Sequence, residues 1–154
     1  MDTKDRQIVR MLQRDGRITN QELAAHVNLS PSPCLRRVKA LEKTGVIEGY
    51  SAQVNAKAYG LTVTAFVSIQ LERHNDETVA KFEQAVARMD EVMDCYVMAG
   101  QADYQLRVVV EDLESYETFV RERLQKIGGL ASIDTRFAYG TVKEKAVFPN
   151  IGAA

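Results

Sequence analysis

Cysteine, histidine and long apolar runs are all scarce in this sequence of 154 residues. Its two cysteines, Cys34 and Cys95, lie too far apart for a metal-binding pair and are expected to be reduced thiols. Its two histidines, His26 and His74, lie beside no nucleophile pattern. No apolar run reaches the roughly 18 residues of a membrane-spanning helix, and the polar N-terminus is unlike a secretion signal. We therefore predict no catalytic residue, no metal, no cofactor and no membrane association, and expect a cytoplasmic protein.

The charges of the chain are distributed unevenly, although the net charge is only −1. Residues 1–60 hold 10 Lys and Arg against 6 Asp and Glu, whereas residues 61–154 hold 10 against 15. A basic front half tolerates a polyanion, and an acidic back half repels one. The asymmetry indicates two modules with different partners.

Three short amphipathic helices are predicted in the first 43 residues. The first covers residues 2–15 and ends at Gly16. The second begins at a capping box, Thr19–Glu22. The third covers residues 30–43, with Ser30 as N-cap and a proline at the first helical position. Because roughly one turn joins the last two helices, the arrangement is a predicted helix-turn-helix.

The third helix is predicted to have a buried face and a cationic face. Leu35, Val38 and Leu41 recur at helical spacing and are expected to be buried, and Arg36 points the opposite way. Alone, such a face is more readily read as an ordinary solvated surface. With the preceding helix and the basic front half, it predicts a surface that reads double-stranded DNA, in which Arg36 contacts a base and Arg37 a phosphate. The predicted DNA-binding residues are Thr19, Asn20, Gln21, Ser30, Ser32, Pro33, Arg36, Arg37, Lys39 and Lys43.

The rest of the chain has mainly strand and helix patterns in alternation. Residues 46–54 are predicted to form a small two-stranded wing, so we expect a winged helix-turn-helix domain (1–50), a connector (51–60) and a second domain (61–154). In the second domain, strands are predicted at 61–72, 92–98, 104–110 and 133–142, with 148 as an alternative end of the last, and helices are predicted at 76–89 and 113–127. This α+β order, βαββαβ, is the ferredoxin-like plan. Its uncovered sheet face is expected to mediate dimerisation.

Four stretches together resemble one family. They are Asp15–Asn20, Leu29–Val38 with its Ser-Pro-x-Pro-Cys run, Gly45–Tyr50 and Gly100–Tyr104. In this order the chain resembles the Lrp/AsnC (feast/famine) regulators of bacteria. The resemblance implies a winged helix-turn-helix joined to a ligand-sensing RAM domain, related to ACT domains. It also implies nucleoid-associated dimers that assemble into tetramers, octamers or larger species, bind an amino-acid effector between dimers, and regulate genes of amino-acid metabolism.

The resemblance also implies effector-binding residues. The turn Gly100–Tyr104 carries Gly100, Asp103 and Tyr104, of which Asp103 can receive an ammonium group. Residues near the start of the last strand follow from the resemblance as well, and these are Thr135, Ala138 and Tyr139. Gln101 replaces an acidic residue common in the family, which leaves the effector open. Read without the resemblance, the turn is an ordinary hairpin.

Two other functions fit the same outline. A sirohaem decarboxylase subunit resembles this two-module chain but uses histidine at the sensory module, where only His74 is available. Sirohaem absorbance would identify it. A nucleoid-organising protein would wrap DNA with little sequence preference, which the ratio of specific to non-specific affinity would reveal.

Overall fold

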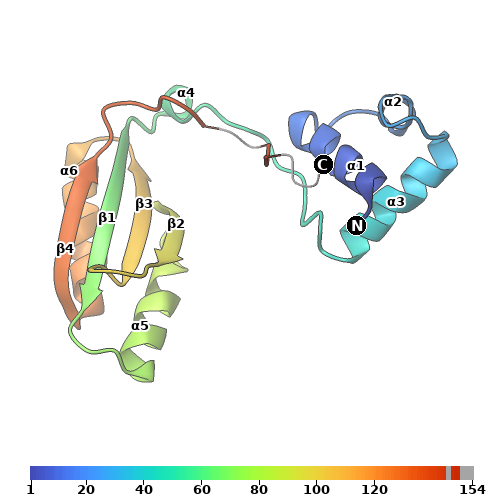
Figure 1. The fold of residues 1–154 in the computed structure, drawn as a ribbon. Coiled ribbons are helices and arrows are strands. Elements are labelled where there is room, and N and C mark those ends of the chain that lie inside the picture. Colours follow the sequence, from blue (N-terminus) through green and yellow to red (C-terminus); the bar gives the residue numbers. More distant parts are fainter. Residues whose placement is uncertain (145–146, 150–154) are drawn as a thin grey trace. The chain divides into compact units, whose positions relative to one another are not determined.

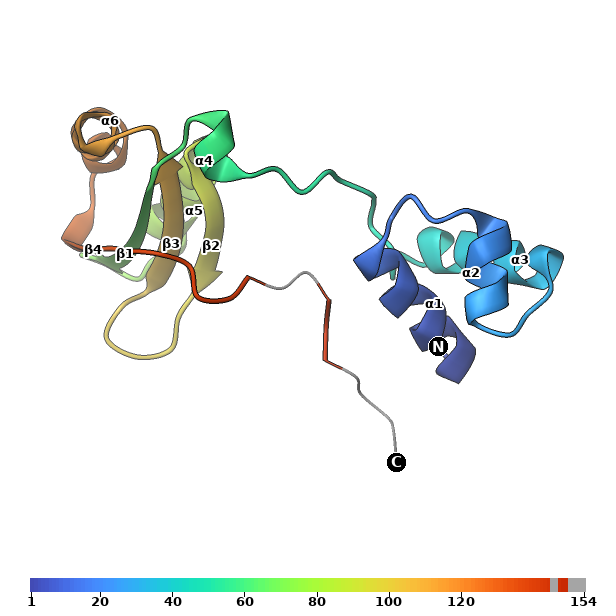
Figure 2. The same ribbon diagram turned by 90° about the horizontal axis from the view of Figure 1, so that it is seen from above.

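The computed structural model describes residues 1–144 and 147–149, which form two compact units (Figures 1 and 2). One unit contains Met1–Gln53 together with the described residues from Val142 on, and the other is Val54–Thr141. None of the described helices combines the length and the apolar character that a membrane crossing would require.

The N-terminal unit consists of three helices around a small core. Helix α1 covers Thr3–Arg14, α2 covers Asn20–His26 and α3 covers Pro31–Lys43. Capping boxes begin the first two helices, at Asp2 and at Thr19, and Pro31 begins the third. The three helices share one cluster of buried side chains, formed by Ile8, Leu23, Ala24, Val27, Cys34 and Leu41. The predicted helix-turn-helix is confirmed.

Three details of this unit differ from the prediction. Ser30 holds the N-cap position of α3, but its side chain makes no capping hydrogen bond. Leu35 is not buried, since 43% of it is exposed, and the buried positions are Cys34 and Leu41. The predicted wing at 46–54 contains no strand. Instead, the N–H groups of Val46 and Ile47 both donate to the carbonyl of Leu41, at 3.0 and 3.2 Å. The start of this segment therefore caps the C-terminal end of α3, and no hairpin forms.

The second unit is a four-stranded antiparallel sheet with helices on one face (Figure 1). The strand order is β2-β3-β1-β4. The elements are the short helix α4 (Ala56–Tyr59), β1 (Val63–Leu71), α5 (Asp76–Val86), β2 (Val92–Val97), β3 (Tyr104–Val110), α6 (Leu113–Phe119) and β4 (Leu130–Phe137). Helix α6 continues through a π turn, Val120–Leu124, and a 3-10 turn, Gln125–Ile127. The predicted βαββαβ plan is confirmed.

The last strand lies earlier than predicted. Gly128 and Gly129 both have positive φ, 74° and 73°, so the chain turns back at once and β4 begins at Leu130 instead of residue 133. It ends at Phe137, which pairs with Ala65 near the start of β1. Ala138 and Tyr139 therefore follow the strand. The described residues beyond them contain no strand, and residues 145–146 of the extension suggested to 148 lie outside the described part of the chain.

Two leucines on the same helical stretch provide a test of the core of this unit. Leu124 is fully buried against the sheet, whereas Leu113, at the start of α6, is 62% exposed. Leu124→Ala should lower the free energy of unfolding by about 2–5 kcal/mol, because it leaves a cavity. The matched control, Leu113→Ala, should change it by less than about 1 kcal/mol. Urea titration followed by circular dichroism measures both, and equal losses would contradict the assigned core.

Candidate DNA-binding surface and candidate effector site

Helix α3 presents one continuous polar and cationic face to solvent. Cys34 is fully buried, Val38 and Leu41 pack with it, and these contacts fix the rotation of the helix about its axis. The residues exposed on the other side are Ser32, Arg36, Lys39, Ala40 and Lys43. This surface, called here the reading face, combines small residues with long cationic ones, as a helix seated in a DNA groove requires. The structure thus brings four predicted DNA-binding residues together, and their contacts with DNA remain predictions.

The turn between α2 and α3 depends on two asparagines. Asn28 has a φ of 53°, a left-handed conformation that asparagine tolerates better than most residues. Its neighbour Leu29 donates its N–H to the carbonyl of Ala24 at 2.9 Å. The Asn20 Nδ2 donates to the carbonyl of Pro31 at 2.9 Å, so this side chain joins the starts of the two helices. Asn20 was predicted to contact DNA, but this bond gives its side chain a structural role.

The start of α2 is occupied by its own capping box. The Thr19 hydroxyl accepts a hydrogen bond from the Glu22 N–H at 3.2 Å, and the Glu22 carboxylate accepts one from the Thr19 N–H at 3.0 Å. Two hydrogen bonds from Thr19 hold the pKa of Glu22 below its usual range. The larger effect comes from the Thr19 hydroxyl and the smaller from its N–H. A carboxylate here offsets the positive end of the helix dipole. Of the predicted contacts in this turn, the exposed side chain of Gln21 is therefore the most available to DNA.

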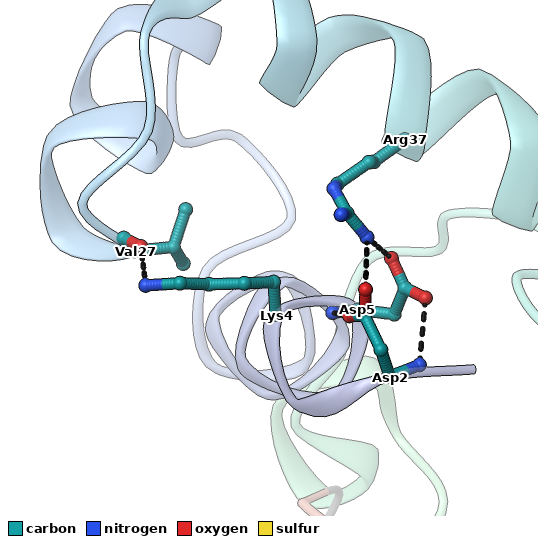
Figure 3. A network of polar contacts seen from close by, with 5 residues as sticks. All are labelled: Asp2, Lys4, Asp5, Val27 and Arg37. Atoms are coloured by element: carbon teal, nitrogen blue, oxygen red, sulfur yellow. Dashed lines mark hydrogen bonds and ion pairs between the residues drawn. The ribbon is translucent and has the colours of Figure 1, made fainter.

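Arg37 is engaged inside the N-terminal unit (Figure 3). Its Nη1 donates to the carboxylates of Asp2 and Asp5, each at 2.7 Å, and so joins α3 to the first turn of α1. Beside it, the Lys4 Nζ donates to the carbonyl of Val27 at 2.5 Å. The pKa of Asp2 is lowered, first by the Asp5 N–H and then by the Arg37 guanidinium. Arg37 is therefore a poor candidate for the predicted phosphate contact, and its two acidic partners lie too far back in sequence for helical periodicity to reveal them.

The predicted effector turn is held together largely by Asp103. Its N–H donates to the carbonyl of Ile69 and its carbonyl accepts from Met98, both at 2.8 Å. Its Oδ2 accepts the N–H of Leu71 at 2.7 Å, and its Oδ1 lies 3.6 Å from the His74 Nδ1. One carboxylate oxygen thus ties the end of β1 to the turn. The other oxygen lies beside the exposed imidazole of His74, a neighbour that the sequence did not place here.

Two of the other predicted effector residues point into the helix-covered side of the sheet. Tyr104 is only 4% exposed, and its hydroxyl donates to Glu83 at 2.9 Å. Burial, and then Glu83, raise the pKa of this phenol to about 12. The Thr135 hydroxyl bonds to that of Tyr116 at 2.6 Å, under α6. Both side chains are structural, at odds with direct effector contacts.

The predicted effector residues do not converge within one chain. The turn holding Gly100 and Asp103 lies at the end of the sheet where β1 finishes, because Ile69 pairs with Tyr104. Ala138 and Tyr139 follow the opposite end, since Ala138 donates its N–H to the Thr64 carbonyl near the start of β1. A site that uses both groups of residues requires a second copy of the chain.

Two family models match the chain in the same order as its two units. One, described as winged helix-turn-helix DNA-binding, matches residues 1–48. The other, described as Lrp/AsnC ligand binding domain, matches residues 64–148 and so more than half of the chain.

Individual proteins are similar over nearly the full length. The Bkd operon transcriptional regulator of Pseudomonas aeruginosa is 39% identical over 97% of this chain and 97% of its own. The leucine-responsive regulatory protein of Escherichia coli is 37% identical over 94% of this chain and 88% of its own. Among solved structures, a transcriptional regulator from Neisseria meningitidis in complex with L-Met matches with a TM-score of 0.92, at 32% identity, over 97% of this chain and 96% of that one.

The ion pair between Arg37 and the start of α1 has a testable pH dependence. Asp2 has a lowered pKa in the folded state, so its stabilising contribution is complete above the unfolded value of 3.8 and is lost as pH falls through the folded value. Arg37→Ala should therefore lower the thermal midpoint of the N-terminal unit by a constant amount above about pH 5, and this difference should shrink below about pH 4. Circular dichroism melts at several pH values measure it.

The matched control is Arg36→Ala on the same helix, because the described residues include no ion-pair partner for Arg36. Its melting midpoint should stay near that of the unchanged chain throughout. A midpoint loss for Arg37→Ala that does not vary with pH would contradict the role of the two carboxylates.

Proposed function

Because the chain belongs to the Lrp/AsnC family of transcriptional regulators, we propose that it binds specific DNA sequences and regulates genes of amino-acid metabolism in response to a small amino acid. The observation that carries this proposal is the exposed cationic reading face of α3, in one chain with a ligand-binding domain. Residues 1–50 bind DNA, 51–60 connect, and 61–154 sense the effector and oligomerise. Since its target is chromosomal DNA, the protein acts on the nucleoid, in the cytoplasm.

In this proposal the residues of α3 have different tasks. Ser32 and Pro33 allow the helix to approach the base edges closely, and Arg36 hydrogen-bonds to a base, most favourably a guanine. Lys39 and Lys43 contact phosphates, which fix the position of the helix but carry no sequence information. Arg37 is assigned to holding α1 and α3 together instead.

The effector is proposed to be an amino acid that binds where two copies of the chain meet. Asp103 Oδ1 receives its ammonium group, and Gly100, with a φ of 128°, places backbone close to the ligand. The L-Met complex of the Neisseria relative supports an amino acid as the chemical class. The separation of the predicted residues to opposite ends of the sheet supports a site between copies.

Dimerisation is proposed to use the sheet face that the helices leave open. Phe66 on β1 and Tyr96 on β2 are 42% and 59% exposed there. Between them, Arg107 pairs with Asp94, so the face mixes aromatic rings with satisfied polar groups. Covering it with a second copy removes apolar area from water. Further assembly of dimers into tetramers, octamers or larger species then creates the effector sites.

Substitutions on the reading face test the assignment of base and phosphate contacts. Arg36→Ala should weaken binding to a selected site by about 1–3 kcal/mol and relax the preference at one base position. Lys39→Ala should weaken binding to selected and random DNA alike and reduce the salt slope by about one. Fluorescence anisotropy at several salt concentrations measures both. An unchanged chain that binds selected and random duplexes equally would instead favour a DNA-organising role.

The effector site is tested by its charge. Asp103→Asn keeps an oxygen that can accept the Leu71 N–H, but it removes the negative charge that attracts an ammonium group. A thermal-shift panel of amino acids identifies the effector. Its affinity should then fall about ten- to a hundredfold in Asp103→Asn, the range expected for loss of a charged hydrogen bond.

The exposed Asp90 provides the control for charge, since Asp90→Asn removes a carboxylate elsewhere in the same unit. Its effector affinity should match that of the unchanged chain. Undiminished binding by Asp103→Asn would show that the ammonium lies elsewhere.

A further inference from the structure

One large apolar side chain of the helix-turn-helix has no place in the core. Among residues 20–43, all of which the structure describes, Leu35 is the only large hydrophobic residue that is exposed, at 43%. The other apolar positions of α3 are satisfied, since Cys34 is fully buried, Leu41 is 5% exposed, and Val38 packs on the same cluster. The core of the N-terminal unit is therefore complete without Leu35.

Leu35 borders the reading face by position. Residues three and four apart are neighbours on a helix surface, so Leu35 lies between Ser32 and Lys39, both of which are exposed. Arg36, the proposed base-reading residue, is adjacent in sequence. The result is an exposed apolar group at the edge of the reading face, with a hydroxyl and an ammonium group as its neighbours there.

The surroundings of Leu35 indicate what covers it. A second copy of the same helix would bring Arg36, Lys39 and Lys43 against their own counterparts, and like charges disfavour that contact. DNA can cover both the cations and the leucine. Its phosphates attract the cations. In the major groove, the C5 methyl of thymine is the apolar group that base edges present.

We propose that Leu35 is a specificity-determining residue that contacts a thymine methyl in the major groove. This inference rests on the proposed function, since it requires that α3 reads DNA. It divides the recognition between Arg36, which reads a base by hydrogen bonding, and Leu35, which reads an adjacent thymine by apolar contact. The preferred site should then hold an invariant thymine beside the base that Arg36 reads.

The test replaces thymine by uracil, which removes the methyl and keeps the hydrogen-bonding groups. Duplexes are first selected from a random library with the full chain, and each thymine of a half-site is then replaced singly. At one position the affinity should fall about fourfold, as expected for burial of one methyl group. Because this measurement uses the unchanged chain, it does not depend on whether a variant folds.

Variants then assign the methyl contact to its residue. Leu35→Ala should bind the thymine and uracil duplexes equally, and should match the unchanged chain on the uracil duplex to within about twofold. The control, Leu113→Ala, makes the same chemical change at an exposed helical leucine of the other unit and should keep the full thymine preference. Sedimentation of Leu35→Ala should show an unchanged oligomer.

Several results would overturn the proposal. These are an unchanged chain with no methyl dependence at any thymine, a Leu35→Ala variant that keeps the dependence, or a Leu35→Ala variant that loses an oligomeric state, which would place Leu35 between copies. The proposed function fails separately, if the unchanged chain enriches no sequence from the library at all.

Discussion

The three short helices of the N-terminal unit depend on one shared core. They have 12, 7 and 13 residues, and isolated helices of this length are marginal in water. Burial of Cys34 and Leu41 stabilises α3 and also sets its rotation, so the same contacts that make the helix stable decide which of its side chains face outward. The ion pairs from Arg37 to Asp2 and Asp5 add a polar link between α1 and α3. Every proposed DNA contact depends on this arrangement.

Much of the fold followed from local patterns. The capping box at Thr19 and the proline at the start of α3 are local signals, and the structure has both helices where these signals place them. Leu35 shows where periodicity is ambiguous, because Cys34 and Leu35 both fit a stripe with Val38 and Leu41. Which of the two is buried depends on Ile8 and Leu23, which reach the cluster from other helices. Arg37 shows the same limit, since its partners on α1 are more than 30 residues away.

The candidate effector site was only partly predictable, for reasons of geometry. Asp103 could be chosen by its chemistry, but its hydrogen bond to Leu71 and its approach to His74 connect segments that are distant in sequence. The effector residues expected from the family resemblance near the last strand depended on where that strand begins. Two successive glycines with positive φ, Gly128 and Gly129, moved the start by three residues and left Tyr139 beyond its end. Asp103 consequently has two tasks, since an oxygen that holds the turn together neighbours the one proposed to bind ligand.

The two thiols differ in exposure, so their reactivity can report local opening of the N-terminal unit without an added label. Cys34 is fully buried, whereas Cys95 is exposed on β2 of the other unit. Burial raises the pKa of both thiols, and Glu83 adds to the effect at Cys95, so the difference between them is one of access. A thiol-reactive reagent should therefore modify Cys95 in the native state and Cys34 only when the helix-turn-helix opens. The rate of Cys34 modification then reports the opening equilibrium of the N-terminal unit. Bound DNA or effector would slow or speed that reaction according to which state each one favours.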